Sequence, residues 1–212
     1  MKKLSVFISL CIVFGLFVAK SSLAQFQGVI YFDKIKSETT KYVYYIKGKK
    51  VRIDEFSDDG EVKGVMLVDL GQGTVTALHP ERKLYMDASN KTSPSPSNIK
   101  VTKTTNKQTI HGVECVEWIA RSEDEGTEIS YWVILESKYD FFQPLLKTLN
   151  RKDRISKYFL ECDGIDKKFT MKGIEKSLDG SVRTSLEVTK IEEKNVDNSL
   201  FQIPSDYVKF EK

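Results

Sequence analysis

The chain has 212 residues and a formal net charge of +3, with 33 Lys and Arg against 30 Asp and Glu. Three of the lysines, Lys2, Lys3 and Lys20, lie in a segment that we expect to be removed, which leaves 30 basic against 30 acidic residues. A balanced chain does not attract a polyanion over a distance, so the composition argues against nucleic-acid binding.

The start of the chain has the order of a secretory signal peptide. Lys2 and Lys3 precede an apolar run from Leu4 to Val18, and the small-residue site Ser22-Leu23-Ala24 follows. The run is shorter than the about 20 apolar residues of a membrane-spanning helix, although an uncleaved N-terminal anchor is the alternative. We expect a signal peptide over 1–24, cleavage near Ala24 and export to the periplasm or the extracellular space.

The remaining residues, 25–212, predict a single β-rich domain with no transmembrane segment. Short stretches rich in β-branched and aromatic residues recur, bounded by turn residues, and this pattern predicts an antiparallel meander. We expect strands at Phe26 to Lys34, Tyr42 to Lys47, Val51 to Phe56, Val62 to Leu70, Thr74 to Leu78, Lys83 to Asp87, Ile99 to Thr104, Gly112 to Arg121, Glu128 to Leu135, Tyr158 to Cys162, Lys168 to Ser177 and Val182 to Glu192.

Several of these strands are apolar on both faces, whereas strands of a sheet with one solvent-exposed face alternate between apolar and polar residues. Val65-Met66-Leu67-Val68 and Tyr131-Trp132-Val133-Ile134-Leu135 show the pattern. Both sides of the central strands must therefore be covered. A strongly curved, unclosed and half-barrel-like antiparallel sheet meets this requirement, as would a closed barrel or a sandwich. The predicted fold class is mainly β.

One short helix is expected, from Phe141 to Asn150, with Asp140 as its N-cap. Phe141, Leu145 and Leu149 recur every four residues and give the helix a wide apolar stripe. A helix of this kind needs an apolar surface to cover. We expect it to pack on the concave side of the sheet and to plug its opening.

Two segments that look like motifs are interpreted as connections. Gly71-Gln72-Gly73 is followed by the β-branched run from Thr74 to Leu78, so no helix N-terminus is available to hold a phosphate, and a hairpin turn is predicted. The Ser-Pro segment from Lys91 to Asn98 predicts a long loop within one sheet.

The inventory of catalytic residues is small. His79 and His111 both lie at strand ends, and neither has a recognisable set of partners. Metal-ligand spacing and a nucleophile elbow are both missing from the sequence. We therefore expect no enzyme and no cofactor or metal, and a hydrolase using His79 or His111 is the least favoured hypothesis.

Aromatic and apolar side chains on the concave side can form a filled core or can line a cavity for an apolar ligand. The candidates for such a cavity are Tyr42, Tyr44, Met66, Val68, Tyr131, Val133, Phe141, Leu145 and Leu149.

Removal of the signal peptide takes away Cys11 and leaves two cysteines, Cys115 and Cys162. An even pair in an exported chain suggests a disulfide between them. Two buried, unpaired thiols are the alternative.

Four segments carry a family resemblance: YYIKGKKVRID, MLVDLGQGTVTALHPERKLYM, HGVECVEW and LFQIPSDYVKF. They resemble an exported family known as domain of unknown function 4412, which is similar in turn to the periplasmic lipoprotein carriers and receptors of the LolA/LolB type. The resemblance implies an unclosed antiparallel barrel, a helix against its concave face and an apolar cavity between them.

These observations favour a soluble, exported and non-catalytic binding protein for a lipid, an acyl chain or a lipoprotein. The alternative is a cell-envelope interaction or structural module that has a filled core and an envelope protein as its partner. A lipid that co-purifies with the protein would distinguish the two.

Overall fold

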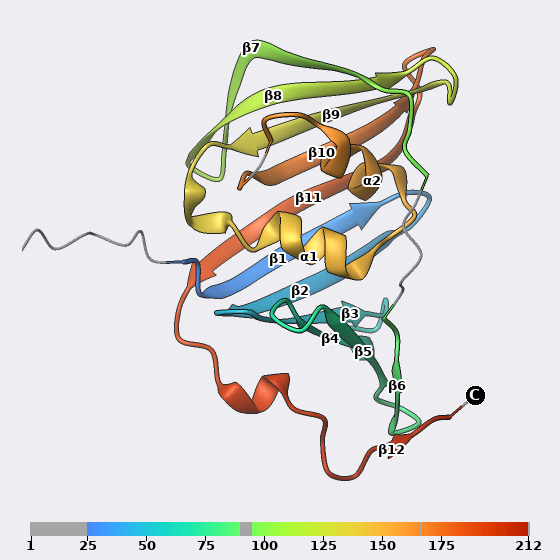
Figure 1. The fold of residues 1–212 in the computed structure, drawn as a ribbon, viewed down its shortest axis with the longest axis vertical. Helices are drawn as coiled ribbons and strands as arrows, with labels where there is room; N and C mark the ends of the chain where they lie inside the picture. Colours follow the sequence, from blue (N-terminus) through green and yellow to red (C-terminus); the bar gives the residue numbers. More distant parts are fainter. Residues whose placement is uncertain (1–24, 90–94, 166, 212) are drawn as a thin grey trace, which may run out of the picture.

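The computed structural model describes residues 25–89, 95–165 and 167–211. Within them, twelve strands form one sheet in the order β12-β6-β5-β4-β3-β2-β1-β11-β10-β9-β8-β7 (Figure 1). Neighbouring strands in this order are antiparallel, except that β12 pairs with β6 in parallel. The expected signal peptide, and residues 91–94 of the expected Ser-Pro loop, lie outside the described residues.

The strands follow the predicted meander closely. They are β1 (Gly28–Ile35), β2 (Thr39–Lys47), β3 (Lys50–Phe56), β4 (Val62–Asp69), β5 (Thr74–His79), β6 (Leu84–Asp87), β7 (Lys100–Ile110), β8 (Val113–Ser122), β9 (Thr127–Ile134), β10 (Phe169–Ser177), β11 (Val182–Glu193) and β12 (Val208–Lys209). The Gly71-Gln72-Gly73 segment connects β4 to β5 as the predicted hairpin turn, and Gly73 has the positive φ of 67° that such a turn needs.

Two α-helices are present where one was expected. They are α1 (Phe142–Leu149) and α2 (Arg154–Glu161), and two short 3-10 helices, η1 (Ser137–Tyr139) and η2 (Asn198–Phe201), accompany them. The predicted cap is wrong, because the N-cap of α1 is Phe141 and no side chain caps the helix. No helix in the described ranges is long and apolar enough to cross a membrane.

The expected strand from Tyr158 to Cys162 is wrong, because these residues form the second half of α2 and its C-cap. The Asp153 side chain accepts a hydrogen bond of 3.0 Å from the backbone N–H of Ser156, which starts the helix. Ile155, Tyr158 and Phe159 then recur at helical spacing, and their side chains are buried against the sheet.

The sheet is strongly curved and unclosed, as predicted. Strand pairing shifts by a residue at several positions, including Tyr31/Phe32 in β1 and Glu55/Phe56 in β3. Such bulges bend the strand and increase its twist. Both helices lie on the concave face, in front of the central strands in Figure 1.

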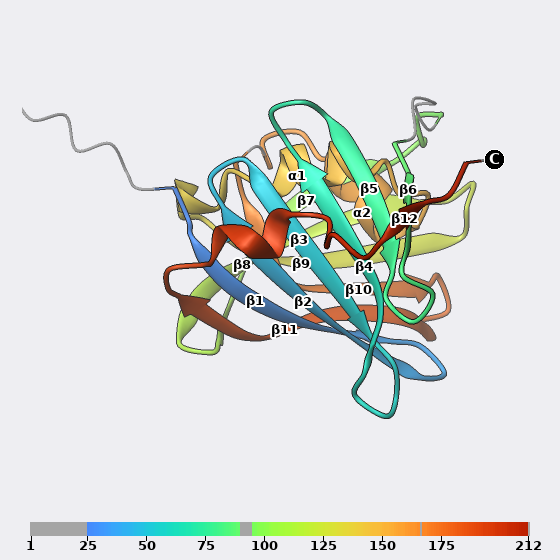
Figure 2. The same cartoon turned by 90° about the horizontal axis from the view of Figure 1, so that it is seen from below.

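Both faces of the central strands are covered. On β2, Tyr44 and Ile46 belong to the large core on the concave side, whereas Val43 packs with Val29 and Val196 in a smaller cluster on the other face. The segment after β11, including η2, runs across this second face in Figure 2. It contributes Leu200 and Phe201 to the cluster, together with Tyr31, Tyr45 and Phe56 of the sheet.

Candidate functional site

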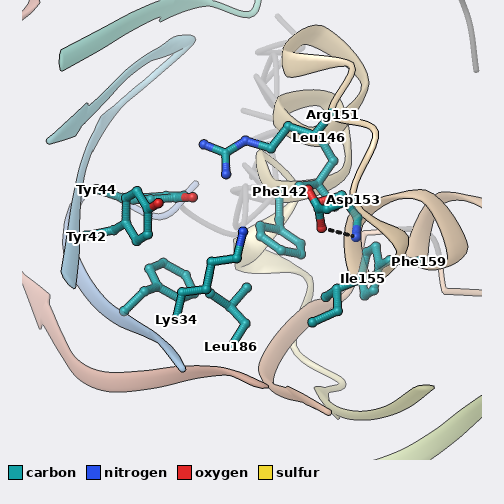
Figure 3. A pocket seen from close by; sticks show the side chains of 12 residues that line it. Lys34, Tyr42, Tyr44, Phe142, Leu146, Arg151, Asp153, Ile155, Phe159 and Leu186 are labelled. Atoms are coloured by element: carbon teal, nitrogen blue, oxygen red, sulfur yellow. Dashed lines mark hydrogen bonds between the residues drawn. The ribbon is translucent and has the colours of Figure 1, made fainter. Parts of the chain in front are cut away.

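A pocket lies on the concave side of the sheet, between strands β1, β2 and β11 and the α1–α2 pair (Figure 3). Its free volume is about 30 Å³, far below the roughly 300–1,000 Å³ of a typical small-molecule site. The pocket is therefore narrow, and nearly filled by the side chains that surround it.

The inner part of the pocket is apolar and is built by the sheet and the helices together. Phe32 and Tyr44, from neighbouring strands, have ring centroids 4.6 Å apart, and Phe142 of α1 meets Phe159 of α2 at 5.2 Å with the rings nearly perpendicular. Edge-to-face aromatic pairs of this kind are favourable. The apolar lining consists of Phe32, Phe142, Leu146, Ile155, Phe159 and Leu186.

The rest of the lining is polar and comes from both sides of the pocket. Lys34 lies on β1, Tyr42 and Tyr44 lie on β2, and Arg151 and Asp153 lie in the short connection between α1 and α2. Figure 3 shows the Arg151 guanidinium, the Lys34 amine and the hydroxyls of Tyr42 and Tyr44 pointing toward the same space.

The chain direction at the end of α1 brings Arg151 to this place. Asn150 adopts the left-handed conformation, with φ 47° and ψ 45°, and its N–H donates a hydrogen bond of 3.0 Å to the carbonyl oxygen of Leu146. This is a common way for a helix to end, because it satisfies a terminal carbonyl and turns the chain. Arg151 then points from the helix end toward β2.

Asp153 is the acidic member of the lining, and its carboxylate is already engaged. Its two oxygens accept hydrogen bonds from the Ser156 N–H at 3.0 Å and from the Ser156 hydroxyl at 3.1 Å. Among the described residues, neither Lys34 nor Arg151 forms an ion pair, although the charge of the Asp153 carboxylate acts on both. The two cations of the pocket are therefore without a direct acidic partner there.

Burial shifts the pKa values of the polar side chains that line the pocket. Desolvation lowers the pKa of Lys34, although the nearby Asp153 carboxylate partly opposes that effect. Desolvation raises the pKa of Tyr44, and it raises the pKa of Tyr42 to about 12, with Glu55 adding to the effect. Both phenols therefore remain neutral hydrogen-bond donors at ordinary pH, and Tyr44 in turn raises the pKa of Arg151.

The structure brings two of the nine candidate cavity residues, Tyr42 and Tyr44, into this pocket. The other seven belong to the large core on the concave side: Val68, Tyr131, Val133, Phe141 and Leu145 are buried, and Met66 and Leu149 are partly buried against it. As the structure stands, these seven side chains fill the interior rather than line the pocket. Lys34, Arg151 and Asp153 were not among the candidates.

The two histidines lie apart. His79 ends β5 and accepts a hydrogen bond of 3.4 Å from the backbone N–H of Arg82 through Nδ1. His111 lies in the turn between β7 and β8, and its Nε2 is 2.8 Å from the carbonyl oxygen of Val188. Among the described residues, no group of three or more His, Cys, Asp and Glu could hold a metal ion.

The expected bridge between Cys115 and Cys162 is not formed, because the structure holds both residues as free, buried thiols. Cys115 lies on β8, and Cys162 caps the C-terminal end of α2. Desolvation raises the pKa of Cys115 to about 11 and that of Cys162 to about 12, so both remain protonated inside the core.

Comparison with known proteins gives one family match. The model of a family described as "Domain of unknown function (DUF4412)" matches residues 26–207. A comparison with curated protein sequences gives no match.

A comparison with solved structures gives several matches at low sequence identity. An uncharacterized conserved protein from Thermus thermophilus has a TM-score of 0.50 and 11% identity, over 86% of this chain and 89% of that one. PNGF-II has a TM-score of 0.45 and 13% identity, over 87% of this chain and 30% of that one. A domain from Vibrio parahaemolyticus, described as a putative outer membrane lipoprotein-sorting protein, has a TM-score of 0.33 and 11% identity, over 82% and 88%.

Proposed function

The chain belongs to the family described as a domain of unknown function (DUF4412), and on this premise we propose that it is an exported, soluble and non-catalytic binding protein. Its ligand is the apolar chain of a lipid, an acyl group or a lipoprotein. The pocket between the sheet and the α1–α2 pair carries this proposal, because its inner part is apolar and the polar ends of Lys34, Tyr42, Tyr44 and Arg151 point toward one space. Ligand sites are built in this way, from apolar walls and a few polar groups.

The size of the pocket requires a movement for binding. A free volume of about 30 Å³ does not hold an acyl chain. An acyl chain would therefore have to displace Phe142 and Phe159, the side chains that the two helices insert into the concave side.

The expected export places this activity in the periplasm or outside the cell. The basic start, the apolar run and Ser22-Leu23-Ala24 support it. A carrier for an apolar molecule is useful there, because such a molecule has to cross water between two membranes or surfaces.

A second function is favoured by the packing of the interior. Tyr131, Val133, Phe141 and Leu145 are fully buried, and aromatic rings fill much of the concave side. A protein with this interior can be a cell-envelope interaction or structural module that binds an envelope protein and no lipid.

One experiment separates the two functions. Phe142 lines the pocket and its neighbour Phe141 is buried beside it without lining it, so Phe142→Ala and Phe141→Ala form a matched pair. Each should lower the free energy of unfolding by about 3–5 kcal/mol. If the pocket takes an acyl chain, Phe142→Ala alone should change the uptake of a fluorescent fatty acid.

The unmodified protein provides the second measurement. Mass spectrometry of its organic extract should show a co-purifying lipid or fatty acid. An extract without lipid, together with no binding of the fluorescent fatty acid by the wild type or by Phe142→Ala, would reject the carrier and favour the interaction module.

A further inference from the structure

The two unpaired cations of the pocket lead to an inference about the ligand's head group, which rests on the proposed function. We propose that the pocket selects an amphiphile with an anionic head, a carboxylate or a phosphate ester, held between Arg151 and Lys34. The hydroxyls of Tyr42 and Tyr44 are the neighbouring neutral donors. The apolar chain of the same molecule extends from the head toward Phe142 and Phe159.

The arrangement of the four side chains supports an anion. They come from both sides of the pocket, from β1 and β2 and from the connection after α1, and their polar ends point toward one space. A guanidinium presents a planar fork of N–H donors that fits a carboxylate or a phosphate with two parallel hydrogen bonds. Tyrosine hydroxyls add single donors beside the fork.

The charges around this space leave it positive. Arg151 and Lys34 face it directly, and Lys36 lies close enough to act on Lys34. Asp153 is the acidic group of the lining, but both of its oxygens are used by Ser156 at the start of α2.

One further carboxylate near the pocket belongs to Glu55. It lies on β3 and contributes to the raised pKa of Tyr42, and its charge also acts on Lys34 and Arg151. Neither Asp153 nor Glu55 forms an ion pair with Arg151 or Lys34, so an anionic ligand can approach the guanidinium.

A buried cation is costly unless it has a partner. Burial lowers the pKa of Lys34, which means that its ammonium form loses hydration in the pocket. An anionic head would recover part of the stabilisation that Lys34 loses, whereas a neutral head would add no opposite charge beside either cation and a cationic head would be repelled. The preference for anions follows from this difference.

The test compares head groups on one chain length. Wild-type protein is titrated with dodecanoate, dodecyl phosphate, dodecyl maltoside and dodecyltrimethylammonium, each below its micelle concentration, and with inorganic phosphate alone. Displacement of a fluorescent fatty acid and calorimetry report binding. The two anionic amphiphiles should bind at least about tenfold more tightly than the neutral one, because a hydrogen bond to a charged group contributes that much to the affinity.

Variants connect the preference to the two cations. Arg151→Gln and Lys34→Gln should each reduce the preference for the anionic heads, while Arg151→Lys should keep part of it. Lys147→Gln is the matched control, because Lys147 is an exposed residue of α1 that does not line the pocket. Thermal unfolding of each variant shows whether a loss of binding is a loss of fold.

The outcomes separate the two proposals. Equal binding of all four dodecyl compounds would agree with the proposed carrier function but would contradict the proposed preference for an anionic head group. An unchanged preference in a folded Arg151→Gln variant would contradict it as well. Binding of no dodecyl compound would overturn the proposed function itself. Binding of inorganic phosphate with the same affinity as dodecyl phosphate would overturn the amphiphile and leave a site for a free anion.

Discussion

The hydroxyl of Tyr131 donates a hydrogen bond of 2.8 Å to the carbonyl oxygen of Ile155, inside the core. This contact ties the first turn of α2 to the middle of β9. The neighbouring strand leaves room for the approach, because a Cβ at Gly173 would lie 3.1 Å from Cγ2 of Ile155. Helix α2 is therefore held close to the sheet at the edge of the pocket.

Tyr131→Phe should loosen this attachment without emptying the core. Loss of the hydroxyl removes one buried hydrogen bond, and we expect the free energy of unfolding to fall by about 0.5–1.5 kcal/mol. Tyr45→Phe is the control, since Tyr45 lies with the cluster on the other face. Urea denaturation of both variants measures the effect. Equal stability of the two variants would show that the Tyr131 hydrogen bond contributes nothing.

Leu145 and Leu149 should respond differently to truncation. Leu145 is fully buried in the core, whereas Leu149 is partly exposed at the end of α1. We expect Leu145→Ala to lower the free energy of unfolding by about 2–5 kcal/mol, because it leaves a void, and Leu149→Ala to cost less. Chemical denaturation checks the order. A small cost for Leu145→Ala would mean that the interior can collapse or already contains space.

The two cysteines should be unreactive in the folded protein. Their thiols are buried, and their pKa values of about 11 and about 12 keep them protonated at pH 8, where the thiolate is the species that alkylating agents attack. Iodoacetamide should modify neither residue in the native state and both in urea without a reductant. Modification that requires a reductant would demonstrate a Cys115–Cys162 disulfide.

Acid pH should weaken the ion pairs that hold the start of α2 in place. Arg154 bridges Glu125 at 2.8 Å and the buried Glu175 at 3.1 Å, and its contact with Glu125 lowers the pKa of that carboxyl from its ordinary value of 4.5. A lowered folded-state pKa gives stability that is present above 4.5 and is lost as pH falls through the lowered value.

Glu125→Gln should therefore be less stable than the wild type at neutral pH and should lose less stability in that acidic range. Thermal unfolding between neutral and acid pH measures both effects. Glu114→Gln, which alters an exposed pair with Lys107, is the control. Parallel pH profiles for the wild type and Glu125→Gln would contradict the assignment.

Processing of the N-terminus is the last prediction. The basic start, the short apolar run and the site Ser22-Leu23-Ala24 should lead to cleavage that makes Gln25 the first residue of the exported protein. N-terminal sequencing of protein recovered outside the cytoplasm checks it. A chain that still begins at Met1 would support the uncleaved anchor instead.

The fold was predictable from local patterns, and its main error has a local explanation. The run from Tyr158 to Cys162 is short and rich in aromatic and apolar residues, and such a run does not distinguish a strand from half of a helix. The deciding signal lay upstream. Asp153 could be an N-cap, and Ile155, Tyr158, Phe159 and Cys162 follow at spacings of three, one and three.

The pocket was less predictable, because it depends on contacts between distant parts of the chain. Tyr42 and Tyr44 could be selected from the pattern of their strand. Arg151 and Asp153 lie outside every strand and helix expected from the sequence, and Lys34 is the last residue of an expected strand. These side chains lie close together because the curvature of the sheet brings β1 near the connection between α1 and α2. Sequence spacing holds no information about that distance.

The pairing of β1 with β11 has a consequence for how the chain folds. Gly28 lies opposite Glu193 and Ile35 opposite Ser185, so β1 takes its place beside a strand that lies far from it in the sequence. The hairpins β2–β3 and β8–β9 join strands that are neighbours in the sequence, whereas one edge of β1 stays open until all the strands between β1 and β11 have been made. Contacts between such distant residues make folding slow. A nascent chain of this protein would therefore lack the junction between the two halves of its sheet until β11 has been made.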